Sequence, residues 1–118
     1  MTDRTTYAPL ILSAYDHEPE SYYLMLTDDA MVAVEDEFEA CGQYGNGYGW
    51  AGVARAAVLA HAPEVSERLT YDPEAGMFIA RSRDLDALQR LAALLSQAFH
   101  DRARLAELIR GVDPDDFD

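Results

Sequence analysis

A glycine-rich stretch, Cys41–Trp50, places the strongest constraint on how this chain can fold. It reads Cys-Gly-Gln-Tyr-Gly-Asn-Gly-Tyr-Gly-Trp and holds four of the chain's seven glycines. Glycine permits positive φ angles and a close approach of the backbone to another surface. Because helical patterns lie on both sides of the stretch, we predict a rigid, non-repetitive loop that joins two helices.

The segment before this loop has the pattern of one amphipathic helix. Thr27, Asp28 and Asp29 offer N-cap residues. An apolar stripe at helical spacing follows, formed by Met31, Val34, Phe38 and Cys41. The acidic residues of the segment lie largely off this stripe, which predicts a strongly acidic outer face. After the loop, Trp50–Ala62 is alanine-rich and apolar on most sides, which predicts a buried helix that ends at Pro63.

Two β-hairpins are predicted from apolar runs that are separated by turn formers. Leu10–Tyr15 and Ser21–Leu26 form the first pair, and Arg68–Asp72 and Gly76–Arg81 form the second. The second connection, Asp72-Pro-Glu-Ala-Gly76, places proline and glycine where a turn favours them. Ser21–Leu26 carries apolar side chains on both faces, which is typical of a central strand or of a strand with a covered second face.

Two further helices are expected near the C-terminus. Ser82 or Asp84 can cap the first of them, whose apolar stripe consists of Leu85, Leu88, Ala92, Leu95 and Phe99. Beyond His100 the stripe changes phase, so we predict that Asp101 caps a separate last helix that ends at Gly111. The fold class is therefore α+β: a roughly four-stranded antiparallel sheet of two hairpins, packed by about four helices in ββααββαα order.

Length and composition predict one domain, residues 1–118, with mobile ends at 1–6 and 113–118. No apolar run approaches the 18 or so residues that a membrane span needs. Met1–Tyr7 lacks the pattern of a signal peptide, and the single cysteine cannot form an intramolecular disulfide. We expect a cytoplasmic protein.

The charge is the strongest global signal. Twenty-two acidic and nine basic residues give a formal net charge of −13, and every basic residue is arginine. Such a field repels nucleic acid, which makes direct nucleic-acid binding an unfavourable hypothesis. It attracts a basic partner and accelerates association with it. Solubility alone is the simpler explanation of the same charge.

Motifs for catalysis are sparse. Gly47–Gly52 matches G-x-G-x-x-G, but a dinucleotide site needs a preceding strand and a βαβ unit, and here a helix precedes the motif. The three histidines show no metal-ligand spacing, and we interpret them as structural or solvated. Cys41 ends an apolar stripe and is expected to be a small core residue. We therefore expect no enzymatic activity, no cofactor and no metal.

Partner binding is the remaining hypothesis. Acidic residues that precede the glycine-rich stretch would steer a basic partner, and aromatic and polar residues within the stretch would anchor it. The candidate contact residues are Asp28, Asp29, Asp36, Glu37, Tyr44, Asn46, Tyr48 and Trp50. In the structural alternative, Trp50 and one tyrosine hold the loop against the core and the acids are merely solvated. A second functional alternative is a small-ligand-binding or regulatory domain in which the loop forms a pocket wall.

Two blocks of the sequence resemble a known family. Gly45-Asn-Gly-Tyr-Gly-Trp50 is followed by the alanine-rich helix, and Tyr71-Asp-Pro-Glu-Ala-Gly-Met-Phe78 is followed by the capped leucine-rich helix. Together they cover about residues 41–99, and they resemble the immunity protein 51 family of bacterial polymorphic-toxin systems. The resemblance implies a cytoplasmic protein that binds and neutralises a cognate toxin C-terminal domain. It also fits an acidic protein that occludes a basic active-site cleft of its partner.

Overall fold

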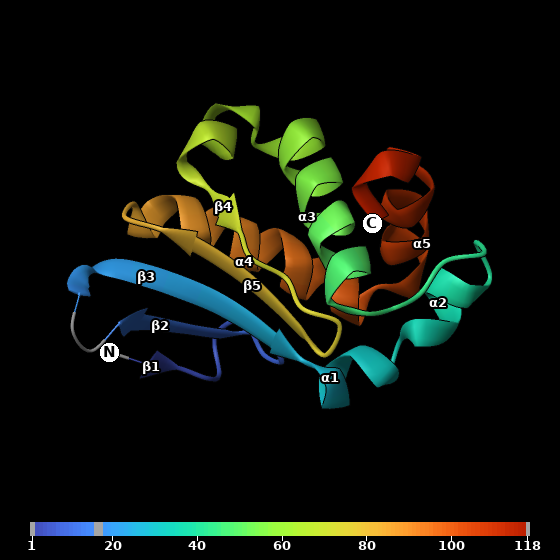
Figure 1. The fold of residues 1–118 in the computed structure, drawn as a ribbon, viewed down its shortest axis with the longest axis horizontal. Helices are drawn as coiled ribbons and strands as arrows, with labels where there is room; N and C mark the ends of the chain where they lie inside the picture. Colours follow the sequence, from blue (N-terminus) through green and yellow to red (C-terminus); the bar gives the residue numbers. More distant parts are fainter. Residues whose placement is uncertain (1, 16–17, 118) are drawn as a thin grey trace.

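The structure is a computed structural model that describes residues 2–15 and 18–117, without the side chains at 18, 19, 116 and 117. His17 and the centre of the first predicted turn lie outside the described residues. One antiparallel sheet forms from β1 (Thr2–Asp3), β2 (Ile11–Tyr15), β3 (Glu18–Thr27), β4 (Thr70–Tyr71) and β5 (Met77–Ser82). Its strand order is β1-β2-β3-β5-β4 (Figure 1). The α+β prediction and both hairpins are confirmed.

The two hairpins join through their second strands. β3 pairs with β5 over six residue pairs, from Tyr22 opposite Ser82 to Thr27 opposite Met77. β3 is therefore the central strand, as its two apolar faces predicted. The additional strand, β1, was not predicted because it consists of two polar residues, which pair with Leu12 and Ser13 of β2.

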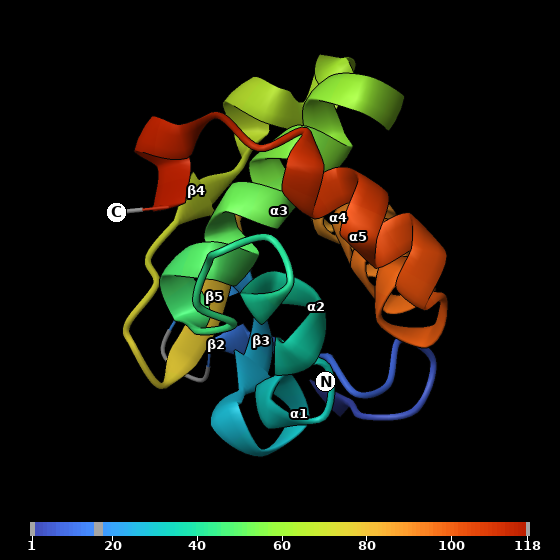
Figure 2. The ribbon, with the colours of Figure 1, turned by 90° about the vertical axis from the view of Figure 1, so that its right-hand side faces the viewer.

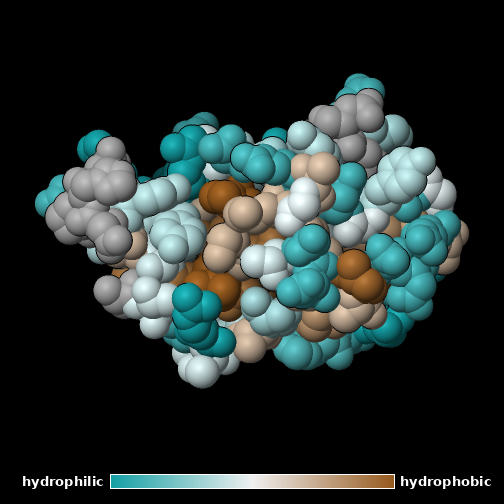
Figure 3. All heavy atoms as spheres, turned by 60° about the horizontal axis from the view of Figure 1, so that its bottom comes forward, coloured by the Kyte–Doolittle hydropathy of each residue, from teal (hydrophilic) through white to brown (hydrophobic). Residues whose placement is uncertain are grey.

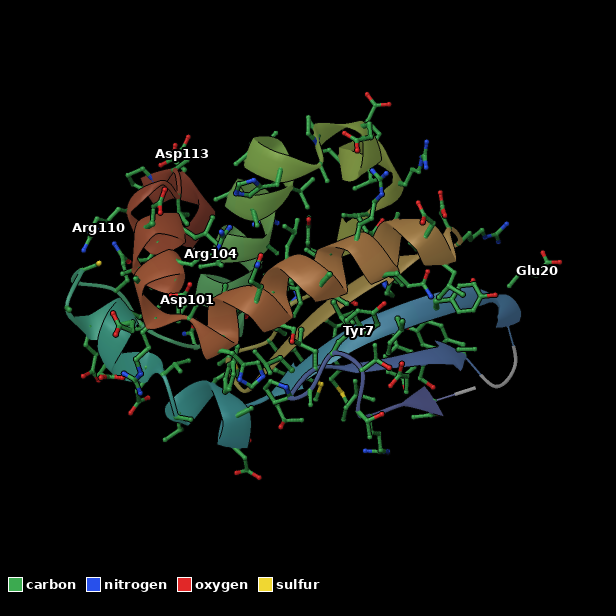
Figure 4. The ribbon with its side chains drawn as sticks, turned by 180° about the vertical axis from the view of Figure 1, so that it is seen from behind. Tyr7, Glu20, Asp101, Arg104, Arg110 and Asp113 are labelled. Carbon is green, nitrogen blue, oxygen red and sulfur yellow. The ribbon has the colours of Figure 1, made fainter. Side chains whose placement is uncertain are left out.

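Helices cover one face of this sheet. They are α1 (Asp28–Val32), α2 (Glu35–Glu39), α3 (Gly47–His61), α4 (Leu85–His100) and α5 (Arg102–Arg110), with 3₁₀ helices at Pro63–Arg68 and Pro114–Phe117. Seen from behind, α4 lies in front of the sheet and slopes in the same general direction as β3 and β5, and α5 folds back from its end at Asp101 (Figure 4). Within residues 2–15 and 18–117, no helix lies over the opposite face of the sheet (Figures 1 and 4).

The core lies between the sheet and these helices. The sheet contributes fully buried side chains to this core from its two central strands: Leu24 and Leu26 of β3, and Phe78 and Ala80 of β5. The predicted stripe of α4 faces them: Leu88, Ala92 and Leu95 are fully buried, while Leu85 and Phe99 are partly buried. Trp50, Phe38 and Phe78 are the largest fully buried side chains among the described residues. Alternation along each strand and helical periodicity thus account for the main layer of the fold.

The predicted helix over residues 28–41 is wrong in one respect, because it is two short helices. The chain tightens at Ala33 and Val34, whose N–H groups bond to the carbonyls three residues earlier instead of four. The break leaves the Ala33 carbonyl without a helical donor, and the Arg102 guanidinium of α5 donates to it at 2.9 Å. A contact that is distant in sequence therefore satisfies the carbonyl that the break exposes.

The predicted caps of the last two helices are confirmed. The Asp84 carboxylate accepts from the Ala87 N–H at 3.4 Å, and the Asp101 carboxylate accepts from the Arg104 N–H at 3.3 Å. Ser82, the other candidate, accepts from the Asp84 N–H at 2.9 Å and so supports the cap. Gly111 follows α5 as its C-cap residue.

Both chain ends contact the rest of the domain where the structure describes them. β1 pairs with β2, and the 3₁₀ helix Pro114–Phe117 packs against α3. Within the N-terminal segment, the Ala8 carbonyl accepts from Ser96 at 3.2 Å and is 2.8 Å from His100 Nε2, both on α4. Among the described residues, no helix has the length and apolar character that crossing a bilayer requires.

Candidate functional site

The glycine-rich stretch is half loop and half helix, which corrects the predicted loop over Cys41–Trp50. Gly42 has φ +75°, the left-handed conformation that glycine favours. Asn46 then caps α3, because its Oδ1 accepts from the Gly49 N–H at 3.0 Å. α3 therefore begins at Gly47, earlier than the predicted start at Trp50. The prediction was late because closely spaced glycines normally indicate a turn or loop and not a helix.

The glycines at the start of α3 serve close packing. A Cβ at Gly47 would overlap the carbonyl oxygens of Glu74 and Met77, and one at Gly49 would overlap the Tyr44 carbonyl. A Cβ at Gly45 would lie 2.9 Å from the Glu35 Cα. The backbone of this stretch is thus pressed against both α2 and the turn before β5.

Trp50 is part of the core, so its proposed role as a surface anchor is corrected. Its side chain is 0% exposed, and its ring lies 5.6 Å from that of Phe38 and 6.4 Å from that of Phe99. The indole Nε1 is buried without a hydrogen-bond partner among the described residues. A partner docking on this conformation does not reach Trp50, which holds α2, α3 and α4 together.

Asp36 and Glu37 are engaged within the molecule. The Arg102 guanidinium donates to both Asp36 carboxylate oxygens, at 2.7 and 2.9 Å, and lies 3.5 Å from Glu37. The hydrogen bond to Asp36 raises the pKa of Arg102. These two carboxylates fasten α2 to α5, so they contribute less to an outward field than isolated carboxylates would.

The other candidate residues are on the surface at one end of the molecule. Asp28 and Asp29 are exposed on α1, and neither forms an ion pair with a described residue. Tyr44 is 81% exposed and Tyr48 is 37% exposed. Asn46 is partly buried, and its side-chain oxygen is taken by the helix cap.

Backbone contacts bring these segments together. Gly45 lies against Glu35, and the Gly47 N–H bonds to the Ala75 carbonyl at 3.1 Å. Met77, two residues later, pairs with Thr27, which immediately precedes Asp28. Figure 2 shows α1, α2, the loop and the start of α3 at the end of the molecule that faces the viewer. We call this surface the acidic end: Asp28, Asp29, Val32, Glu35, Glu39, Tyr44, Tyr48 and Glu74.

Four members of the acidic end were not predicted as contact residues. Glu35 and Glu39 belong to the acidic outer face that the sequence predicted, whereas Val32 and Glu74 were not anticipated. Val32 is 59% exposed at the end of α1, off the stripe of Met31 and Val34. Glu74 is exposed in the turn that packs on Gly47. The exposure of Val32 therefore agrees with the helical periodicity of the segment, whereas the place of Glu74 depends on a contact between distant segments and has no local sequence signal.

Features of other site classes lie elsewhere or are missing. Cys41 and Gln43 of the loop line a cavity of about 400 Å³ together with Ile109 and Val112. Neither this cavity nor those beside Tyr15, His61 and Tyr7 include Tyr44 or Tyr48, so the two exposed rings are not part of these pocket walls. In the described part of the chain, no three His, Cys, Asp or Glu side chains are grouped to hold a metal ion.

Comparison with protein families decides the class. The sequence model of one family, immunity protein 51, matches residues 10–114. The chain belongs to the immunity protein 51 family. The match spans nearly the whole domain, including both hairpins and the acidic end, whereas the resemblance seen in the sequence covered about residues 41–99. Comparisons with curated proteins and with solved structures found no match.

Membership of the immunity protein 51 family places the chain among immunity proteins of toxin systems, whose partner is a toxin protein. The surface through which such a partner would bind is not part of that assignment.

Proposed function

We propose that this immunity protein binds a cognate toxin domain through the acidic end and neutralises it. The observation that carries the proposal is the exposed ring of Tyr44, on the same end of the molecule as carboxylates that form no ion pair with a described residue. The protein acts in the cytoplasm, by binding and not by catalysis. Its partner presents a basic surface, and occlusion of a basic cleft blocks the toxin.

The chemistry of the acidic end suits such a partner. Tyrosine rings supply large contact area at low entropic cost and are frequent among residues that dominate binding energy. Asp28 and Asp29 can pair with arginine or lysine, since neither forms an ion pair with a described residue that would have to be broken first. Val32 adds an apolar contact between them and α2. Steering by the carboxylates and anchoring by the rings are thus available on one surface.

The first test is complex formation between the full chain and the C-terminal domain of a candidate cognate toxin. Calorimetric titration at about 20 mM salt, where charge interactions extend furthest, should give a saturable one-to-one complex. Co-expression should restore growth of cells that carry the toxin domain. If no complex forms with any toxin encoded beside this chain, the proposed function is wrong.

A second test concerns the surface. Tyr44→Ala should raise the dissociation constant roughly 10- to 100-fold, as expected for a central aromatic contact. Leu59→Ala is the matched control, because Leu59 is 66% exposed on α3 and lies outside the acidic end. Equal affinities of the two variants would move the interface away from Tyr44 without contradicting toxin binding.

A further inference from the structure

A cavity lies at the opposite end of the central strands from the acidic end. Its volume is about 520 Å³, and its lining includes Tyr15, Tyr22, Arg68, Arg81, Arg83 and Asp84. Tyr22 and Ser82 are the last paired residues of β3 and β5 in this direction, whereas Thr27 and Met77 end the same ladder beside α1. The length of the β3–β5 pairing therefore separates the two surfaces.

The cavity reverses the charge of the rest of the molecule. Among the described residues that line it are three of the chain's nine arginines and one carboxylate, so these residues carry two positive charges net in a chain of −13. Arg68 donates to Asp84 at 2.8 Å, and Arg81 lies 3.8 Å from Asp72. Arg83 is exposed and forms no ion pair with a described residue. Its guanidinium is available to an incoming anion.

The lining favours a carboxylate over a phosphate. Guanidinium groups bind either anion through paired hydrogen bonds. Asp84 belongs to the same wall, and its negative charge disfavours a dianion more than a monoanion. The Glu20 side chain projects beyond the end of the sheet (Figure 4) and does not add its carboxylate to this lining. A single carboxylate thus matches the charge of the lining best.

The surroundings of the cavity favour a peptide over a free ion. Its volume falls within the range of roughly 300–1,000 Å³ that organic ligands occupy. The Tyr15 ring, which packs against Tyr23 at 4.9 Å, forms one wall. Arg81 lies opposite Tyr23 in the β3–β5 ladder, on the face of the sheet that the helices do not cover. It therefore links the cavity to this uncovered face. A row across β2, β3 and β5 follows there, formed by the partly buried side chains of Ile11, Met25 and Ile79.

This uncovered face is apolar in the middle and polar around it. Figure 3 shows hydrophobic residues gathered in its centre, with hydrophilic residues along the edges. We propose that the cavity binds the carboxylate of a glutamate or aspartate in an extended peptide segment, whose apolar neighbours lie along this face. The protein then has two binding surfaces of opposite charge, and this one takes an acidic segment of a protein partner.

The test uses a capped pentapeptide with a central glutamate between leucines, and the same peptide with glutamine. Each is titrated into the ¹⁵N-labelled full chain, and amide shifts are followed up to about 10 mM peptide. With the glutamate peptide, the amide chemical shifts of residues 68–70 and 81–84 should change until they reach a plateau. The dissociation constant should be at least roughly 5-fold lower than that of the glutamine peptide. Inorganic phosphate is titrated separately.

Variants locate the contact. Arg83→Gln should raise the dissociation constant of the glutamate peptide by roughly 5-fold or more, and Arg81→Gln should have the same effect. Arg4→Gln is the control, since Arg4 is exposed, lies outside the cavity and has no described ion pair. Circular dichroism verifies that each variant is folded.

Three results would overturn the assignment: equal affinity for the two peptides, no saturable shift, or an unchanged affinity of Arg83→Gln. Tighter binding of phosphate than of the glutamate peptide would also overturn it, by assigning the cavity to phosphate. Because these titrations contain no toxin, their failure leaves the test of the proposed function untouched.

Discussion

Within the glycine-rich stretch, Gly47 has the least room for a side chain. Alanine is a better helix former than glycine by about 1 kcal/mol, so Gly47→Ala in isolation would stabilise α3. In this fold the new Cβ overlaps the backbone carbonyls of Glu74 and Met77, which cannot rotate away as a side chain would. We expect the free energy of unfolding in urea to fall by about 2–3 kcal/mol.

Gly76→Ala is the matched control in the same turn. A Cβ at Gly76 would meet no atom within 4 Å, and its φ angle is not in the left-handed region. Its free energy of unfolding should stay within about 0.5 kcal/mol of the unsubstituted chain. Equal losses in the two variants would contradict the packing role assigned to Gly47.

Tyr71 is the residue whose titration reports the packing of β4. Burial raises the pKa of its phenol from the ordinary value of 10.0 to about 12, and Arg55, whose guanidinium lies 4.9 Å from the ring centroid, opposes part of that rise. The folded chain holds this proton more tightly than the unfolded chain. The stabilising effect is therefore complete below pH 10 and is lost as the pH rises toward 12.

Tyr71→Phe keeps the ring but removes this ionisation. Rapid-mixing absorbance at the phenolate band should show a difference between the unsubstituted chain and the variant with a midpoint of about pH 12. Arg55→Gln should move that midpoint upward, because the cation that favours the phenolate is gone. A midpoint near 10 would mean that the Tyr71 phenol is solvated.

At the scale of elements, α1 and α2 are too short to be stable alone. Met31 of α1 is buried in the core, and two contacts hold α2 and the segment before it. Phe38 packs on Trp50, and Arg102 joins α5 to Asp36, Glu37 and the Ala33 carbonyl. In Arg102→Gln, we expect amide hydrogens of residues 33–40 to exchange roughly 3- to 10-fold faster. Arg104→Gln removes a neighbouring arginine of α5 without a described side-chain partner, and it should leave these rates unchanged.

The same elements show why sequence reasoning reached most of the fold but only part of the site. The hairpins, α4 and the caps at Asp84 and Asp101 follow from local periodicity and turn chemistry, so they were predicted correctly. The spacing of Met31, Val34 and Phe38 fits an unbroken helix equally well. The carbonyl that the break exposes is satisfied by Arg102, which is far along the chain. Likewise, whether Trp50 faces the core or a partner depends on where Phe38 and Phe99 lie. Its aromatic character alone is compatible with both.

At the scale of the whole molecule, net charge and local charge make different predictions for association. Asp28→Lys with Asp29→Lys changes the acidic end, and Glu67→Lys with Glu107→Lys changes exposed positions outside it. Each substitution raises the charge by two, so both double variants carry −9 instead of −13. If the acidic end receives the toxin, the first variant should slow association at about 20 mM salt by roughly 10-fold or more, and the second by much less.

Salt separates the two effects further. The Debye length falls from roughly 20 Å at about 20 mM salt to roughly 4 Å at about 500 mM, so long-range steering is screened while contacts at the interface persist. The association rate of the unsubstituted chain should therefore drop steeply between these concentrations, and that of Asp28→Lys with Asp29→Lys should change little. Stopped-flow mixing with the toxin domain measures both slopes. Equal salt dependence of the association rate in the two double variants would mean that the overall field of the protein steers the partner. That result would contradict the proposal that the acidic end is the docking surface.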